Sequence, residues 1–246
     1  MKQSLKKFIK YNSLDTSLAI YIRINADWNE SALIVLESLS KDVIDDYRNC
    51  DFYPKSFINI LLFNIDHTIS IIGNEMFRKG GWPKGYTKES YSKFLDERIS
   101  RLLLLQKKLY IMCDNFNNNI INFKYKLDEK NLEINMKESF NNFIEYYNSE
   151  ESLVFYLKEN MKWNEQSFIQ MEQLSKNVIS DYSDFDLYPK AFISTFLYTI
   201  EETISILKSS EFRELYSNNY TNESCSEFII KTIFKLRTLK KFFYSS

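Results

Sequence analysis

The chain has 246 residues, of which 44% are hydrophobic, 16% aromatic and 26% charged, a composition typical of globular proteins and too apolar for intrinsic disorder. Its 32 basic and 33 acidic side chains give a formal charge of −1, so nucleic acid is not expected as a main partner. Only four glycines and three prolines are present, which argues against an all-β fold with many tight turns and favours helices.

The N-terminal segment Met1–Tyr11 returns in the second half of the chain as Met136–Tyr146. A constant offset of about 135 residues is far longer than a solenoid repeat, so the repeated unit is a whole domain. The sequence therefore predicts two copies of one domain. The same offset relates these further stretches: Trp28-Asn29-Glu30 and Trp163-Asn164-Glu165, Leu39-Ser40-Lys41 and Leu174-Ser175-Lys176, Asp46-Tyr47 and Asp181-Tyr182, Tyr53-Pro54-Lys55 and Tyr188-Pro189-Lys190.

Three helices are expected in the first part of each copy. The first covers Lys2–Tyr11 or Lys137–Tyr147, and the second is indicated by apolar residues at helical spacing around Ile22 or Leu157. The third begins after an asparagine that suits the N-cap position, Asn29 or Asn164, and is followed by a glutamate in the first turn. In the first copy this helix should end between residues 47 and 52.

Two longer helices complete each copy. Pro54 or Pro189 is placed at the start of the fourth helix, where its missing amide hydrogen is not needed. The last helix follows the N-cap residue Thr87 or Thr221. Helices of this length with short connections predict an all-α fold in which an antiparallel helical bundle is duplicated in tandem.

The predicted domain boundaries follow from the duplication. The first bundle covers residues 1–114, a linker covers 115–135, and the second bundle covers 136–246. Asparagines fill positions 115 and 117–119, and apolar and polar residues alternate over 121–127. Alternation with period two favours either a small β-hairpin or an extended linker, and both alternatives remain open.

Residues for catalysis or metal binding are sparse. His67 is the only histidine, and Glu202 replaces it in the second copy, so a multi-histidine zinc site is excluded. The cysteines Cys50, Cys113 and Cys225 have no metal-type spacing, and no phosphate-binding glycine motif is present. We therefore predict no catalytic, cofactor-binding or metal-binding residue. No apolar run approaches a membrane span and no signal core is present, so a cytoplasmic location is expected.

Two features favour protein binding. The loop Gly80–Tyr86 concentrates glycine, tryptophan and tyrosine, residues that often anchor interfaces. An acidic stretch, Asp45, Asp46 and Asp51, lies at the end of the third helix of the first copy. The predicted partner-binding residues are Trp82, Lys84, Tyr86, Asp45, Asp46, Asp51, Tyr53 and Lys55. Two structural alternatives stay open. The side chain of Trp82 could pack on its own bundle. Trp28 precedes an N-cap, so its side chain suits a hydrophobic staple with Leu33.

The pattern W-N-E-x-x-[LF], followed by D-Y and Y-P-K, occurs in both copies, as in Trp28-Asn29-Glu30. In this pattern the chain resembles the all-helical immunity proteins of bacterial contact-dependent and polymorphic toxin systems. The resemblance implies a non-enzymatic inhibitor that neutralises a cognate toxin domain by direct binding, and the acidic stretch would suit a basic nuclease toxin.

Two other functions remain open. One is a helical enzyme or nucleic-acid-processing module with a site in the groove between the copies, using His67, Asp66 and Glu201. The other is a scaffold or dimerisation module. The oligomeric state is not predicted.

Overall fold

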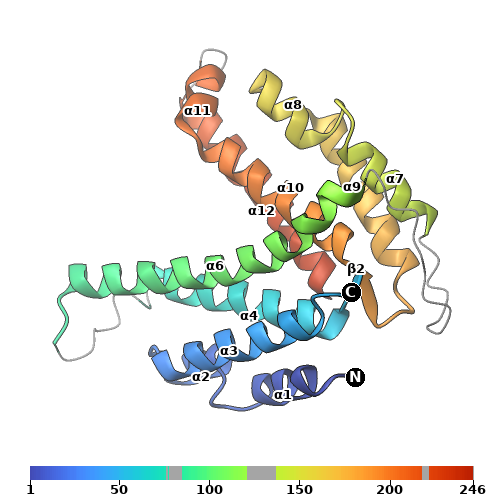
Figure 1. Cartoon of the computed structure of the whole chain (residues 1–246). Coiled ribbons are helices and arrows are strands. Elements are labelled where there is room, and N and C mark those ends of the chain that lie inside the picture. Colours follow the sequence, from blue (N-terminus) through green and yellow to red (C-terminus); the bar gives the residue numbers. More distant parts are fainter. Residues whose placement is uncertain (76, 78–84, 121–136, 218–221, 246) are drawn as a thin grey trace. The chain divides into compact units, whose positions relative to one another are not determined.

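The computed structural model describes residues 1–246 except 76, 78–84, 121–136, 218–221 and 246, and only the backbone of residues 110–120, 217, 222 and 223. The described residues are mainly helical, so the predicted all-α fold is confirmed (Figure 1). The chain divides into two compact units, Met1–Met112 (unit 1) and Cys113–Ser246 (unit 2), which are described separately.

In unit 1, α1 (Gln3–Asn12) packs against α3 (Glu30–Asp46) and α4 (Lys55–Gly73), and α2 (Leu18–Asn25) packs against α3 and α4. A strand of three residues that the sequence pattern does not predict, β1 (Phe52–Pro54), leads into α4.

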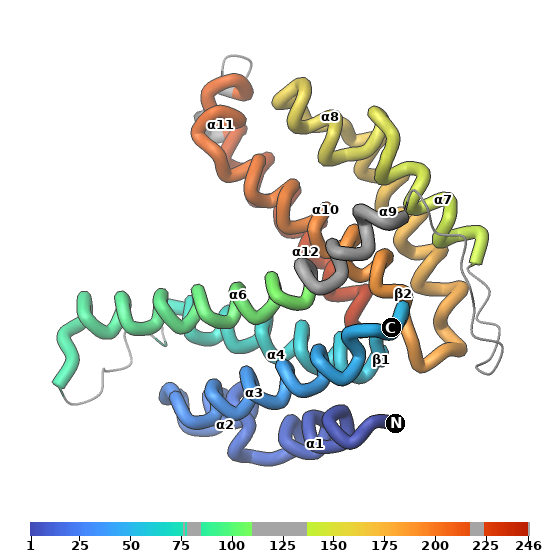
Figure 2. The backbone as a smooth tube through the Cα atoms, in the orientation of Figure 1, coloured from blue at the N-terminus to red at the C-terminus, as the bar shows by residue number. Residues whose placement is uncertain are grey.

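The helix α6 (Lys88–Ile120) is long, as the backbone tube in Figure 2 shows. It begins after Thr87, whose hydroxyl accepts a hydrogen bond from the amide of Ser90 at 3.2 Å. This cap agrees with the predicted start of the helix. Because α6 continues to Ile120, residues 115–119 are helical, although the sequence predicts that they belong to a linker. The hairpin or extended segment expected over 121–135 lies outside the described residues.

Unit 2 is built around α10 (Lys190–Lys208), which packs against α7 (Glu138–Tyr147), α8 (Leu153–Asn160), α11 (Ser210–Ser217) and α12 (Asn222–Ser245). A further helix, α9 (Glu165–Asp181), packs against α7, α8 and α12. The strand β2 (Leu187–Pro189) precedes α10 as β1 precedes α4. The short helix α11 is a separate element that the sequence pattern does not predict.

The two units repeat the same helix bounds. From α1 and α7 to α4 and α10, every first and last residue is displaced by 135 positions. The N-caps also correspond, because Asn29 accepts a hydrogen bond from Ala32 at 3.0 Å and Asn164 accepts one from Ser167 at 3.1 Å. Both second helices end on a non-glycine residue in the left-handed region, Ala26 (φ 50°) and Met161 (φ 48°). The predicted tandem duplication therefore extends to backbone detail.

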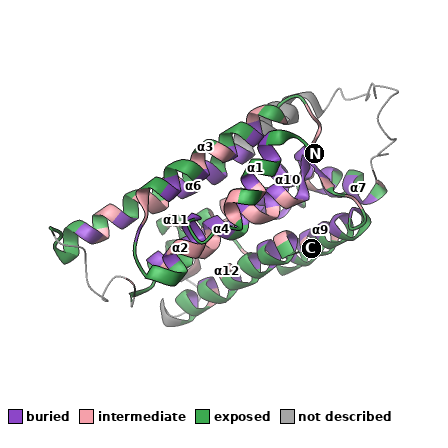
Figure 3. Cartoon of the chain, turned by 90° about the horizontal axis from the view of Figure 1, so that it is seen from below, coloured by how far each residue is buried: buried purple, intermediate pink, exposed green. Residues whose placement is uncertain are grey.

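Figure 3 colours each described residue by its burial. The buried residues of α4 recur at helical intervals, whereas all of the first eight residues of α10 are buried. In unit 1 the ring of Phe57 on α4 contacts Phe8 and Tyr53. The ring cluster of unit 2 is larger, because the ring of Phe192 on α10 contacts four others: Phe143, Tyr188, Phe196 and Phe243. Aromatic burial of this kind supplies much of the apolar stabilisation of each unit.

A buried tyrosine joins three helices in unit 2. The hydroxyl of Tyr146, at the end of α7, donates a hydrogen bond to the carbonyl of Ser167 at 2.6 Å and accepts one from the amide of Leu153 at 3.0 Å. Burial raises the pKa of Tyr146 to about 12. The equivalent Tyr11 donates to the carbonyl of Ala32 at 2.8 Å, so the same junction is present in unit 1.

One helix meets the length and composition of a membrane span. Among the described residues this is α4, which has 19 residues and a window of mean hydropathy 1.3. The expectation that no apolar run approaches a membrane span is therefore wrong for α4. In unit 1, nine of its residues are buried and it packs against α1 and α2. The core helix of a bundle passes the same test of length and composition.

Candidate functional site

A largely apolar groove lies between α9 and α12 in unit 2. It has a volume of about 420 Å³. Its walls come from both helices, and we name it the α9–α12 groove. The lining residues are Glu165, Phe168, Ile169, Glu172, Lys176, Phe234, Lys235, Thr238, Leu239 and Phe242.

An exposed apolar stripe runs along α12 at this groove. Ile230, Phe234 and Phe242 are 68%, 71% and 46% exposed, and Thr238 occupies the position between the two phenylalanines. Residues four apart lie on one face of a helix, so these side chains form a continuous ridge. The opposite face of α12 supplies the core, where Leu236 and Phe243 are fully buried. The helix therefore has two apolar faces, of which one packs inward and one remains exposed.

The charges around the α9–α12 groove are compensated within the unit. Lys235 contacts Glu165 at 2.7 Å, and Lys176 contacts Glu172 at 2.8 Å. The hydrogen bond from Lys235, followed by that from the indole of Trp163, lowers the pKa of Glu165. The groove is therefore an apolar surface whose rim carries ion pairs without a net charge.

Unit 1 has the equivalent groove between α3 and α6, with a volume of about 540 Å³. We name it the α3–α6 groove. It is lined by Ile34, Glu37, Ser38, Lys41, Ile44, Asp45, Arg48, Arg101, Leu104, Leu105 and Lys108. An offset of 135 residues on α3 and of 134 on α6 places Ile34 at Ile169, Glu37 at Glu172 and Arg101 at Lys235.

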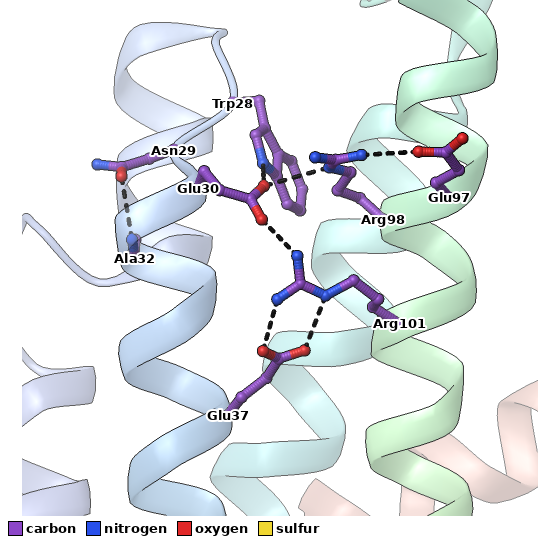
Figure 4. A network of polar contacts seen from close by, with 8 residues as sticks. All are labelled: Trp28, Asn29, Glu30, Ala32, Glu37, Glu97, Arg98 and Arg101. Carbon is purple, nitrogen blue, oxygen red and sulfur yellow. Dashed lines mark hydrogen bonds and ion pairs between the residues drawn. The ribbon is translucent and has the colours of Figure 1, made fainter.

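A polar network connects α3 with α6 at one end of this groove (Figure 4). Arg101 donates two hydrogen bonds to Glu37, at 3.1 and 2.6 Å, and a third to Glu30. Glu30 also accepts hydrogen bonds from Arg98 at 3.2 Å and from the indole of Trp28 at 2.9 Å. Partial burial opposes ionisation of Glu30, but the hydrogen bonds from Trp28, Arg101 and Arg98 outweigh it and lower its pKa.

The positions of α6 that correspond to the stripe on α12 are mostly polar. The positions of Ile230, Phe234, Thr238 and Phe242 correspond to Asp96, Ser100, Leu104 and Lys108. The same bundle therefore forms with three polar residues and one leucine on this face. The apolar side chains on this face of unit 2 are therefore not a requirement of the shared fold, and they form an exposed apolar patch.

Comparison of the chain with models of protein families, with curated proteins and with solved structures finds no match.

The three carboxylates of the predicted acidic stretch have different surroundings. Asp45 bonds to Lys41 at 2.6 Å and to Arg48 as well, so its charge is compensated on two sides. The carbonyl of Asp46 accepts a hydrogen bond from Lys2, and its side chain is exposed. Asp51 is half-buried before β1. The structure thus brings Asp45 to the α3–α6 groove and does not gather the three carboxylates into one patch there.

The other predicted binding residues lie elsewhere. Tyr53 and Lys55 are buried, and the ring of Tyr53 contacts Tyr47 and Phe57. Tyr86 is partly exposed, and its ring contacts Tyr91 at 5.5 Å and Phe94 at 5.4 Å. Trp82 and Lys84 lie outside the described residues.

The residues of the enzyme alternative have structural contacts within their own units. His67 is half-buried and stacks on Phe63, with ring centroids 5.4 Å apart. Glu201 accepts a hydrogen bond from the buried Lys240 at 2.9 Å. Within the part of the chain that the structure describes, no group of three or more His, Cys, Asp or Glu side chains is placed to hold a metal ion.

Replacing His67 with glutamate is expected to stabilise unit 1 by about 0.5 kcal/mol at pH 7. In unit 2 the equivalent Glu202 forms an ion pair with Lys158 at 2.7 Å, whereas in unit 1 the position of Lys158 is held by Arg23. Burial, and to a lesser degree Arg23, lowers the pKa of His67 below its ordinary value of 6.5. Stability should therefore fall as the pH drops from 6.5 through the folded-state pKa, because the unfolded chain binds the proton first.

Urea unfolding followed between pH 7.5 and about 5 checks this expectation, since carboxylates begin to titrate only near the lower limit. The control is His67→Gln, which should lose the pH dependence without gaining the ion pair. If the free energy of unfolding changed with pH in the same way in wild type and in both variants, the role of His67 would be contradicted.

Proposed function

We propose that the chain is a non-enzymatic binding protein that inhibits a partner protein by direct contact. The observation that supports this function best is the exposed apolar stripe on α12 beside the α9–α12 groove. The equivalent face of unit 1 carries Asp96, Ser100 and Lys108, so the stripe is not needed for folding.

The dimensions of the stripe favour a macromolecular partner over a small molecule. Residues 230 to 242 of a helix extend over about 18 Å. Ile230 lies on the stripe but does not line the groove, so the apolar surface continues past the concave part. An amphipathic helix of a partner, with apolar anchors at i, i+3 or i+4 and i+7, fits a surface of this kind. Because the charged residues at the rim of the groove pair with one another, the partner helix needs no particular net charge.

The partner that we propose is the toxin domain of a contact-dependent or polymorphic toxin system. This follows from the resemblance of the repeated Trp-Asn-Glu, Asp-Tyr and Tyr-Pro-Lys pattern to immunity proteins. In this function the chain acts in the cytoplasm and occludes or distorts the toxin domain. The basic nuclease expected from the acidic stretch is one such toxin, although Asp45 is already ion-paired.

Replacing Phe234 with serine is expected to weaken toxin binding at least tenfold, because an exposed aromatic residue at the centre of an interface often dominates its binding energy. Serine occupies the equivalent position in unit 1, so the variant should fold. Calorimetric titration with the purified toxin domain encoded beside the gene measures the affinity, and inhibition of the toxin should fall in parallel.

The control is Phe155→Ser, because Phe155 is also an exposed phenylalanine of unit 2 but lies on α8 outside the groove. It should bind the toxin as wild type does. Equal losses in the two variants would contradict the assignment of the groove. If the wild-type chain bound no candidate toxin at micromolar concentration, the inhibitor function itself would be wrong.

A further inference from the structure

The α3–α6 groove differs from its counterpart in charge. Its lining contains four cationic side chains, Lys41, Arg48, Arg101 and Lys108, and two anionic ones, Glu37 and Asp45. In the α9–α12 groove the lining has two of each sign. The difference arises in part because Lys108 is replaced by Phe242.

The carboxylates of this groove are already engaged. Glu37 accepts two hydrogen bonds from Arg101, and Asp45 contacts both Lys41 and Arg48. The hydrogen bond to Glu37 raises the pKa of Arg101, and that from Lys41 lowers the pKa of Asp45. The lining residues carry four positive and two negative formal charges, and Arg101 also donates a hydrogen bond to Glu30 beside the groove.

Between the cations lies an apolar surface. Ile34 on α3 and Leu104 on α6 are both more than half exposed, and both line the groove. Lys41 comes from the α3 wall and Lys108 from the α6 wall, so a ligand on the apolar surface would meet positive charge from both helices. Oppositely charged side chains on that ligand would form complementary pairs.

We infer that the α3–α6 groove is a second binding site, whose ligand is an acidic amphipathic segment of a partner protein. Apolar side chains of the segment contact Ile34 and Leu104, and its carboxylates contact Lys41 and Lys108. This inference rests on the proposed function as a binding protein and makes the chain bivalent, with one neutral apolar site and one cationic site. The partner is a protein because an apolar surface accompanies the charge, whereas the whole chain carries a formal charge of −1.

Two synthetic helical peptides test this site. They share one leucine-rich apolar face, and their flanking positions carry glutamate in one peptide and lysine in the other. Fluorescence anisotropy titrations with the full chain are expected to show about tenfold tighter binding of the acidic peptide, decreasing with added salt. Lys108→Glu should abolish this preference. The control Lys107→Glu changes an exposed lysine of the same helix outside the groove and should retain it.

The titrations are repeated in Phe234→Ser, which weakens the α9–α12 groove, and the preference for the acidic peptide should persist there because it arises in the α3–α6 groove. Equal affinity for the two peptides, no binding of either, or equal losses in Lys107→Glu and Lys108→Glu would each overturn the inference. A single-stranded oligonucleotide that displaces the acidic peptide at equal concentration would overturn it too, by showing a site for any polyanion. None of these results affects toxin binding that depends on Phe234, so the proposed function is tested separately.

Discussion

Replacing Phe192 with alanine is expected to lower the free energy of unfolding of unit 2 by about 3–5 kcal/mol, the range for removing a buried phenylalanine ring. Phe192 is fully buried on α10, the helix that contacts most others of the unit. Its ring centroid lies 5.1 Å from Phe143, 5.5 Å from Phe196 and 5.7 Å from Phe243. Alanine would leave a cavity that these rings cannot fill, because they come from different helices or turns.

Hydrogen exchange read by mass spectrometry reports this change for each unit separately. Peptides from α10 and α12 should lose protection in Phe192→Ala. The matched control is Phe57→Ala in unit 1, where the ring contacts Phe8 at 5.0 Å and Tyr53 at 5.9 Å. We expect a smaller loss there, confined to α4 and its neighbours. A loss below about 1 kcal/mol for Phe192→Ala would contradict the central position of this ring.

Replacing Tyr146 with phenylalanine is expected to destabilise unit 2 by about 2 kcal/mol, within the range for leaving a buried polar group unsatisfied. Its hydroxyl connects the amide of Leu153, at the start of α8, with the carbonyl of Ser167 in the first turn of α9. The phenylalanine ring fills the same volume, so the effect isolates these hydrogen bonds. Urea unfolding at pH 7 measures the change.

The same hydroxyl predicts a loss of stability at high pH. The pKa of Tyr146 is raised to about 12 from an ordinary value of 10.0, so the folded unit holds the proton more tightly than the unfolded chain. The contribution of Tyr146 to the free energy of unfolding is therefore fully present below pH 10, and the free energy of unfolding should decrease by about 3 kcal/mol as the pH rises towards 12. Tyr146→Phe should lack this part of the decrease. Tyr11→Phe in unit 1 is the matched comparison, and if it alone changed the high-pH behaviour the assignment to Tyr146 would be wrong.

Most of the fold could be predicted because its signals are local or repeated. The N-caps Asn29 and Asn164 mark the start of the third helix in each copy, and their side chains accept the expected hydrogen bonds. In unit 2 the ring of Trp163 lies 5.5 Å from Phe168, the contact expected of a hydrophobic staple, whereas the staple predicted between Trp28 and Leu33 stays a prediction. Residues 115–119 were harder to assign, because asparagine has a low helix propensity that the context of a long helix overrides.

The grooves could not be predicted from apolar spacing alone. On α12 the exposed Ile230 and Phe234 and the buried Ile229 and Leu236 all recur at helical intervals, so periodicity does not show which face turns inward. Comparison of the two copies could have identified the exposed face of α12. At an offset of 134, Phe234 aligns with Ser100 and Phe242 with Lys108, and a position that is polar in one copy marks a surface position in the other.

The equal helix bounds of the two units have a consequence for folding. α3 and α9 share their length, their capping residue and all six of their buried positions, so during synthesis a helix of one copy could pack in the place of its counterpart in the other. Such exchange between sister domains is a known route to misassembled chains. The ring cluster around Phe192 opposes exchange of the last helix, because α6 has Leu109 at the position of Phe243, whose ring contacts Phe192 in unit 2. Sequence divergence after duplication thereby protects each half from being completed by the wrong one.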